Sequence, residues 1–309
     1  MITVPVAAID LGTNTTRLIV AEVSGSTLEE LERRTVITRL GEGVDESGVL
    51  SAAGIERVHE TLSDYSEIVE RRGATPALVV ATSAVRDASN GGELLGEIER
   101  RYGFKVRLLS GNEEALLAFR GATLGRSLMR SMLVVDIGGG STELVLGDAG
   151  GPSFHVSLDI GAVRLSERYL HSDPPSPAEL EHCATAVREL LIDRIPTGVL
   201  HAPTAAIGNA GTITTIAALD QDLPAYDRDR VHGYSVTRQA VHEQLARLAA
   251  LPLSERRQVP ALEPERAPVI VAGAIVCREL LDVFALDAIE ASELDILDGA
   301  ALLAAEGSP

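Results

Sequence analysis

The stretch DLGTNTTRLIV at Asp10–Val20 recurs in altered form as DIGGGSTELVL at Asp136–Leu146. The two copies share Asp, Gly, Thr and Leu at matching positions, and several of the other exchanges are conservative. An apolar run precedes each copy and another follows it, which predicts a strand, a tight glycine-containing turn and a second strand. A repeat of this kind implies two halves of the chain, each opening with a β-hairpin.

The turn of each predicted hairpin has the composition of an anion-binding loop. Glycine lets a backbone approach a ligand closely, successive turn N–H groups can form an anion-binding nest, and Ser and Thr add hydroxyl donors. Two ordinary hairpins with small turn residues are the alternative interpretation. The candidate phosphate-binding residues in these turns are Thr13, Asn14, Thr15, Gly138, Gly139, Gly140, Ser141 and Thr142.

Strand and helix signals alternate around the hairpins. A helix is predicted from an N-cap at Ser51 to a stop at Gly73, and a strand over Leu78–Ala81. Further helix starts are predicted at a capping box of Asn90 and Glu93 and at Ser176–Pro177–Glu179, and further helices over 237–250, 267–284 and 294–305. This pattern predicts α/β architecture twice, with one domain over 1–127, a second over 128–294, and the C-terminal helix at 295–309 returning to the first.

Composition limits the partners and the compartment. The formal charge of −18 over 309 residues argues against nucleic acid, whose binding needs Lys and Arg. The apolar run at 269–277 is about half of a membrane-spanning helix, and the residues up to Asp10 lack the layout of a signal peptide, so a cytoplasmic protein without membrane contact is expected. Cys183 and Cys277 have no ligand partner at metal spacing and are expected to be buried thiols, and the seven histidines form no metal-binding pair.

Several blocks in order carry a resemblance to a known family. They include AAIDLGTNTTRLIV, RLGEGV at 39–44, ATSAVRDASN at 81–90, LLSGNEEALLAFRGA at 108–122, DIGGGSTEL at 136–144 and VHGYSVT at 231–237. Together they resemble the exopolyphosphatase and guanosine pentaphosphate phosphohydrolase (Ppx/GppA) family, within the actin, sugar-kinase and heat-shock-chaperone fold group. The resemblance implies two actin-like (ribonuclease H-like) α/β domains with a cleft between them. GNAGTIT at 208–214 departs from a common family pattern, and the ending ASELDILDGA at 291–300 is similar to the short, actinobacterial-type members.

The resemblance also implies roles for individual residues. Glu114 matches the family's catalytic glutamate and is expected to be the general base, although acids in the first turn of a helix, here with Asn112 as the expected cap, are favoured for capping alone. Asp136 and Glu143, and less directly Asp10, are expected to bind Mg²⁺ or Mn²⁺. Arg17 and Arg86 are expected to bind phosphate, with surface ion pairs as the alternative. Gly208, Gly211 and Thr212 form a third candidate phosphate loop, for which a structural turn is an equal alternative.

The leading hypothesis is an exopolyphosphatase that removes terminal phosphate from inorganic polyphosphate. Guanosine pentaphosphate (pppGpp) is an alternative substrate, and the analogy also suggests a homodimer. With few aromatic residues and no Trp, the chain offers no obvious platform on which guanine could stack, which favours polyphosphate. A non-catalytic sensor of polyphosphate or alarmone is a second class, and an ATP-dependent kinase or chaperone of the same fold is a third. The predicted base Glu114 argues against both.

Overall fold

The computed structural model describes residues 4–25, 27–126 and 131–307. Its contacts divide the chain into two units, one of residues 1–126 and 294–309 and one of residues 127–293. The boundary predicted between residues 127 and 128 lies outside the described residues. In the part of the chain that is described, no helix is both long and apolar enough to cross a membrane.

The first unit is built on a mixed five-stranded sheet of order β3-β2-β1-β4-β5. Hairpin partners β1 and β2 are antiparallel. Strand β4 pairs with β1, and β5 pairs with β4, both in parallel. Its strands are β1 (Val6–Leu11), β2 (Thr15–Ser24), β3 (Thr27–Ile37), β4 (Ala77–Ala81) and β5 (Lys105–Leu108). Its helices are α1 (Val44–Ser47), α2 (Ala52–Arg72), α3 (Ser83–Asp87), α4 (Gly91–Tyr102), α5 (Gly111–Ala122) and α14 (Ile296–Glu306).

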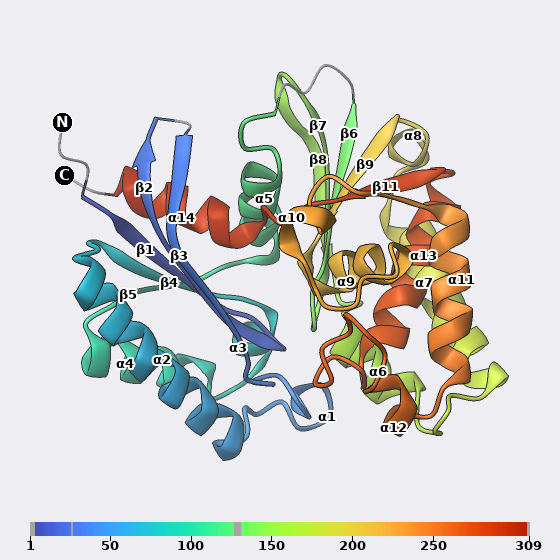
Figure 1. The fold of residues 1–309 in the computed structure, drawn as a ribbon, viewed down its shortest axis with the longest axis horizontal. Helices are drawn as coiled ribbons and strands as arrows, with labels where there is room; N and C mark the ends of the chain where they lie inside the picture. The colour runs from blue at the N-terminus through green and yellow to red at the C-terminus, as the bar shows by residue number, and fades with distance from the viewer. Residues whose placement is uncertain (1–3, 26, 127–130, 308–309) are drawn as a thin grey trace. The chain divides into compact units, whose positions relative to one another are not determined.

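Successive side chains along the strands of this sheet point to opposite faces, and each face is covered by a layer of helices. Ala7, Ile9 and Leu11 of β1 pack with residues of α2 and α4, whereas Ala8 packs with residues of α5 and α14. Figure 1 shows α2 and α4 on one side of the sheet and α5 and α14 on the other. Even-numbered Asp10 therefore shares the face that α5 and α14 cover.

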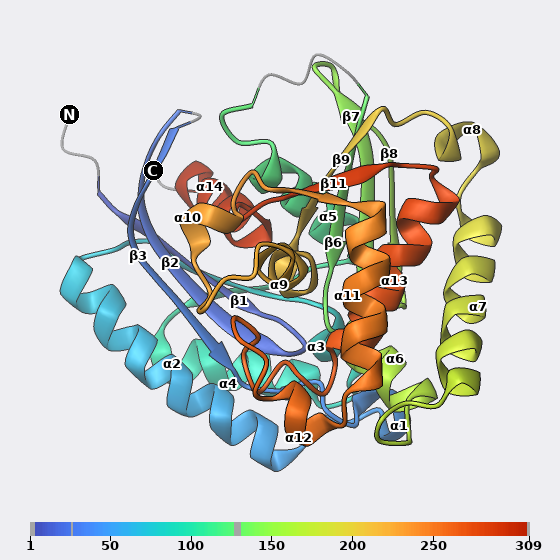
Figure 2. The same ribbon diagram turned by 45° about the vertical axis from the view of Figure 1, so that its right-hand side comes forward.

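The second unit repeats this plan with a six-stranded sheet of order β10-β11-β9-β6-β7-β8. Its strands are β6 (Met132–Ile137), β7 (Thr142–Asp148), β8 (Gly151–Leu158), β9 (Ala205–Asn209), β10 (Ser235–Thr237) and β11 (Ala288–Ala291). Its helices are α6 (Ala162–Tyr169), α7 (Pro177–Arg194), α8 (Thr197–Leu200), α9 (Ala210–Asp220), α10 (Arg228–Val231), α11 (Arg238–Ala250), α12 (Leu253–Arg256) and α13 (Ile270–Val283). Figure 2 shows the long helices α7, α11 and α13 of this unit running alongside one another.

Most predicted elements agree with the structure, and two caps differ. Both hairpins form, and the predicted caps at Ser51 and Ser176 are present. Helix α4 starts after Asn90 as predicted, but the capping box was wrong, because the Asn90 amide instead exchanges two hydrogen bonds with the backbone of Leu50, at 2.8 and 3.0 Å. The prediction of a cap at Asn112 was also wrong, because α5 begins two residues earlier with Ser110 as its N-cap. Cys183 and Cys277 are buried free thiols, as predicted.

Candidate active site

The turn of the first hairpin is braced by the loop that follows β3. Gly12 N–H donates to the carbonyl of Thr15 at 2.9 Å and closes the turn. The carbonyls of Thr13 and Asn14 accept from Gly41 and Arg39, at 2.8 and 3.0 Å. A Cβ on Gly41 would lie 2.3 Å from the Thr13 side chain, so this close approach needs glycine. The RLGEGV block thus fixes the position of the turn residues predicted to bind phosphate.

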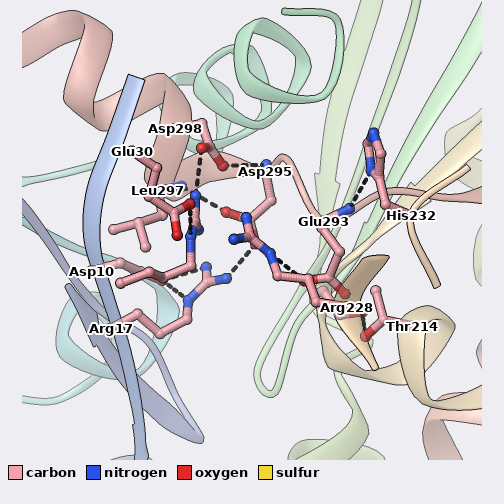
Figure 3. Close-up of polar contacts among 12 residues, drawn as sticks. Asp10, Arg17, Glu30, Thr214, Arg228, His232, Glu293, Asp295, Leu297 and Asp298 are labelled. Carbon is pink, nitrogen blue, oxygen red and sulfur yellow. Dashed lines mark hydrogen bonds and ion pairs between the residues drawn. The ribbon is translucent and has the colours of Figure 1, made fainter. Parts of the chain in front are cut away.

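Arg17 is held between two carboxylates of the first unit (Figure 3). Its Nε and Nη2 donate to Asp10 Oδ2, at 3.1 and 2.7 Å, and its Nη1 donates to Asp295 in an ion pair. Burial opposes the charge of the guanidinium, but Asp295 and Asp10 together raise the pKa of Arg17 well above its usual value. Burial raises the pKa of Asp10, and the charge of Arg17 partly offsets this shift. The other oxygen of Asp10, Oδ1, is buried without a hydrogen-bond partner.

Glu114 lies in the first turn of α5 and is 8% exposed. Burial raises the pKa of Glu114 to about 7; Arg86 opposes that shift, and the charges of Asp10 and Asp87 add to it. Arg86 Nη1 donates to Glu114 Oε2 at 3.0 Å and to the carbonyl of Leu109 at 2.8 Å. A carboxyl group that titrates near neutrality is suited to accept and return a proton.

The neighbouring Glu113 has a structural role. Its carboxylate accepts from Ser110 N–H at 2.9 Å and completes a capping box at the start of α5. The bonds from Ser110 lower the pKa of Glu113 to about 2. Two adjacent acids therefore differ sharply, because one caps the helix in solvent and the other is buried beside Arg86.

The second hairpin is closed and braced in the same manner. Gly138 N–H donates to the carbonyl of Ser141 at 3.0 Å, and the carbonyls of Gly138 and Gly139 accept from the first residues of α6 at 2.9 and 2.8 Å. The carbonyl of Gly140 accepts from the Arg164 side chain at 2.7 Å. The carbonyls of the three consecutive glycines are thus all engaged by α6, which holds the loop rigidly.

Asp136 and Glu143 lie directly opposite each other on β6 and β7. Both side chains are buried, at 7% and 2% exposure, and Glu143 Oε1 accepts from Ser157 Oγ at 2.6 Å. Like charges directly across an antiparallel pair are destabilising in themselves. Among the described residues, no group of three or more His, Cys, Asp or Glu could hold a metal.

The third candidate loop has clear packing reasons for its small residues. A Cβ on Gly208 would lie 2.4 Å from Ile213, and one on Gly211 would lie 1.4 Å from the Arg266 guanidinium. Thr212 is buried against Gly273, where a Cβ would come within 2.4 Å of its hydroxyl. Packing alone therefore accounts for the small residues of this loop, as in the alternative of a structural turn.

Three residues near these groups were not found from the sequence. Asp295 pairs with Arg17, Asp87 adds to the field at Glu114, and Asn209 continues the row of Asp136 and Glu143 onto β9. Asp87 and Asp295 lie in sequence blocks that carried the family resemblance. Their proximity to Glu114 and to Arg17, respectively, depends on tertiary contacts. Asn209 stands where the 208–214 segment departs from the family pattern, and that departure was the available signal.

Comparison with known proteins identifies relatives over nearly the whole chain. The model of the Ppx/GppA phosphatase family matches residues 18–302. The chain is 40% identical over 314 residues to Exopolyphosphatase 2 of Mycobacterium tuberculosis, covering 96% of this chain and 97% of that protein. It is 29% identical to Exopolyphosphatase 1 of the same organism, over 91% of this chain and 83% of that protein.

Solved structures of similar proteins share the fold. An exopolyphosphatase-like protein superposes with a TM-score of 0.92 at 33% identity, covering 97% of this chain and 98% of that one. A Ppx/GppA family member of Aquifex aeolicus gives 0.82 at 30% identity, covering 98% and 97%. An exopolyphosphatase of Cytophaga hutchinsonii gives 0.90 at 24% identity, over 99% of both chains, and supports the fold alone. The prediction of an α/β chain with two actin-like domains is confirmed.

Proposed function

Since the chain belongs to the Ppx/GppA phosphatase family, we propose that it is an exopolyphosphatase that hydrolyses the terminal phosphoanhydride bond of inorganic polyphosphate and releases orthophosphate. The observation that carries the proposal is the state of Glu114. This carboxyl group is buried, contacts Arg86 and has its pKa raised to about 7. A hydrolase needs such a base, whereas a protein that only binds phosphate does not.

In the proposed reaction Glu114 accepts the proton of an attacking water. The water oxygen forms a bond to the terminal phosphorus as the bridging P–O bond breaks, and the shortened chain leaves with the bridging oxygen. The proton then resides on Glu114 and is returned to solvent or to a phosphate oxygen. Arg86 contacts the Glu114 carboxylate and limits how far burial raises its pKa, which keeps part of the glutamate ionised at neutral pH.

The terminal phosphates are expected to bind the two hairpin turns and nearby guanidinium groups. Backbone N–H and hydroxyl groups of small turn residues suit phosphate oxygens. Each turn is held in place by a loop or helix whose N–H groups donate to the turn carbonyls. Arg17 and Arg86 are the guanidinium groups proposed for this role; Arg17 is already paired with Asp10 and Asp295, and Arg86 with Glu114.

A divalent cation, Mg²⁺ or Mn²⁺, is proposed to bind Asp136 and Glu143. Their donor set fits, because hard cations prefer carboxylate oxygens and Mg²⁺ commonly keeps one or two protein carboxylates together with phosphate oxygens and water. When bound, the cation would neutralise charge on the transferred phosphate. Asp10 was also predicted as a ligand; its Oδ2 is occupied by Arg17, so only Oδ1 remains for a metal-bound water.

The test is phosphate release by wild type, Glu114→Gln and Glu113→Gln, with short and long polyphosphate, pppGpp and ATP as substrates. Loss of general-base catalysis should reduce release by about 10²–10⁴-fold in Glu114→Gln. Glu113→Gln is the matched control, because Gln also completes a capping box. Preferred release from pppGpp would change the substrate assignment, and release from ATP alone would favour the kinase-like class. Tight binding of polyphosphate without release by wild type would replace the hydrolase by a sensor.

A further inference from the structure

One face of the second unit's sheet carries a continuous row of polar side chains. Register places Ser157 of β8 opposite Glu143, Glu143 opposite Asp136, and Asp136 beside Asn209 of β9. Residues paired in this way project to the same face of a sheet. Core packing agrees, because the flanking Leu144, Ile137 and Leu158 all belong to the hydrophobic cluster on the opposite face.

Asn209 differs from Ser157 and Glu143 of this row because its side chain has no hydrogen-bond partner. The residue is 0% exposed, and neither the oxygen nor the nitrogen of its side-chain amide has a hydrogen-bond partner. A buried polar group left unsatisfied costs about 1–3 kcal/mol, so such groups are rare and call for an explanation. Asn209 and Asp10 are the residues with such orphan atoms in the described part of the chain.

A structural role would give the amide a partner, whereas a ligand-binding role accounts for its absence. Asn209 lies beside the buried carboxylate of Asp136, which is itself opposite the buried carboxylate of Glu143. Side-chain carbonyl oxygens of Asn bind hard divalent cations together with carboxylates. A donor set of two acids and one amide also agrees with the lack of any three-acid group among the described residues.

We propose that the side-chain carbonyl oxygen of Asn209 is the third protein ligand of a divalent cation held by Asp136 and Glu143. This inference rests on the proposed function, which places a cation at the acidic pair. The amide nitrogen then remains as a donor suited to an anionic oxygen of a phosphate bound to the same cation. The row across β7, β6 and β9 becomes a cation site built from three neighbouring strands.

The experiment measures Mn²⁺ binding by electron paramagnetic resonance, without substrate, in the full chain. Asn209→Leu replaces the amide by an apolar group of similar size. We expect the Kd for Mn²⁺ to rise by at least about tenfold, the loss typical of disturbed metal sites. In EDTA we expect the melting temperature of Asn209→Leu to be equal to or above that of wild type, because an orphan polar group has been removed. A merely structural amide would give a lower melting temperature and an unchanged Kd.

Thr214→Val is the matched control from the same segment. The Thr214 hydroxyl is buried and donates to the carbonyl of Ala210 at 3.2 Å, so its loss should leave the Kd for Mn²⁺ unchanged. Asp136→Asn separates this inference from the proposed function. If Asp136→Asn loses Mn²⁺ but Asn209→Leu binds like wild type, the inference on Asn209 is overturned and the acidic pair stands.

Two further outcomes are decisive. Failure of the wild type to bind Mn²⁺ would overturn both the inference and the proposed cation at Asp136 and Glu143. Should Asn209→Leu not fold, Asn209→Asp provides the test, because a third carboxylate at this place should lower the Kd for Mn²⁺ at least several-fold. An unchanged Kd in Asn209→Asp would overturn the inference.

Discussion

Arg17 lies directly across the first hairpin from Asp10 and donates two hydrogen bonds to a single oxygen of that carboxylate, at 3.1 and 2.7 Å. The same place in the second hairpin is occupied by Glu143, opposite Asp136. The repeat therefore carries opposite charges across one hairpin and like charges across the other. The first pair balances its own charge, whereas the second is the pair proposed above to bind a cation.

This difference predicts a stabilising effect of Mg²⁺ that depends on Glu143. A ligand that binds only the folded state at 100 times its Kd raises the free energy of unfolding by about 2.7 kcal/mol. Wild type should melt at a higher temperature with Mg²⁺ than with EDTA, and Glu143→Gln should lose most of that difference. Differential scanning calorimetry measures both. Asp148→Asn, an exposed change on the same strand, should respond to Mg²⁺ like wild type.

The pKa of Glu114 predicts an acid limb in the pH profile. The base must be ionised to act, so kcat/KM should rise about tenfold per pH unit below a pKa of about 7 and level off above it. Because Arg86 lowers this pKa, Arg86→Gln should move the limb to higher pH as well as reduce activity. Stopped-time phosphate assays across pH 5–9 measure the limb. A profile of Arg86→Gln with an unshifted or lowered pKa would contradict the assignment.

The same pKa predicts how stability depends on pH. The folded-state pKa of about 7 exceeds the reference value of 4.5, so folded Glu114 binds more protons than the unfolded chain between these values. Its contribution is therefore complete below about pH 4.5 and is lost as the pH rises through about 7. Glu114→Gln should be more stable than wild type at pH 8, by on the order of 1–3 kcal/mol, and should not gain at pH 4.5. Urea denaturation at the two pH values checks the sign.

Asp295 predicts a stability effect that can be separated from helix capping. Its carboxylate caps α14 through Leu297 N–H at 2.8 Å and also pairs with buried Arg17. Asp295→Asn keeps a good cap but breaks the buried ion pair, and should lower the free energy of unfolding by about 3–5 kcal/mol. Asp227→Asn, at the cap of α10 with no such pair, should change it by less than about 0.5 kcal/mol. Equal effects of the two substitutions would show that Arg17 does not depend on Asp295.

Helix α5 and helix α14 approach each other through glycines. A Cβ on Gly299 would lie 2.1 Å from the carbonyl of Leu117, and one on Gly121 would lie 1.7 Å from that of Asp295. Gly299→Ala should therefore separate the helices, cost several kcal/mol in urea denaturation and lower kcat, since α5 carries Glu114. Gly92→Ala in α4 meets no atom within 4 Å and should stabilise by up to about 1 kcal/mol. A stable, fully active Gly299→Ala would disprove the close contact.

Local patterns in the sequence predicted the hairpins and most helices, because turn residues, caps and periodicity act over a few positions. The capping box at Ser176, for instance, lies within four consecutive residues. The helix start at Asn90 was predicted correctly, but its capping box was not, because an Asn side chain can equally bind a distant backbone, here that of Leu50. Asn112 was misassigned because two capping residues stand close together in SGNEE, and only Ser110 has the extended backbone of an N-cap.

The candidate site was predicted by resemblance and by residue type, but its charges depend on the fold. Nothing local to Arg17 indicates that Asp295, 278 positions away, occupies one edge of its guanidinium group. In the same way, the different titration of Glu113 and Glu114 follows from capping in one case and burial in the other. The orphan amide of Asn209 could be found only once strand register was known.

The origin of α14 has a consequence for how the chain matures on the ribosome. The first unit takes its last helix from residues 296–306, whereas the second unit is continuous over 127–293. The α5 face that packs against α14 must therefore stay uncovered while the whole of the second unit is translated. At about 5–20 residues per second this interval lasts roughly ten seconds or more, and the later-encoded unit can be complete before the earlier one. The first unit can therefore finish folding only after residues 296–306 have been translated.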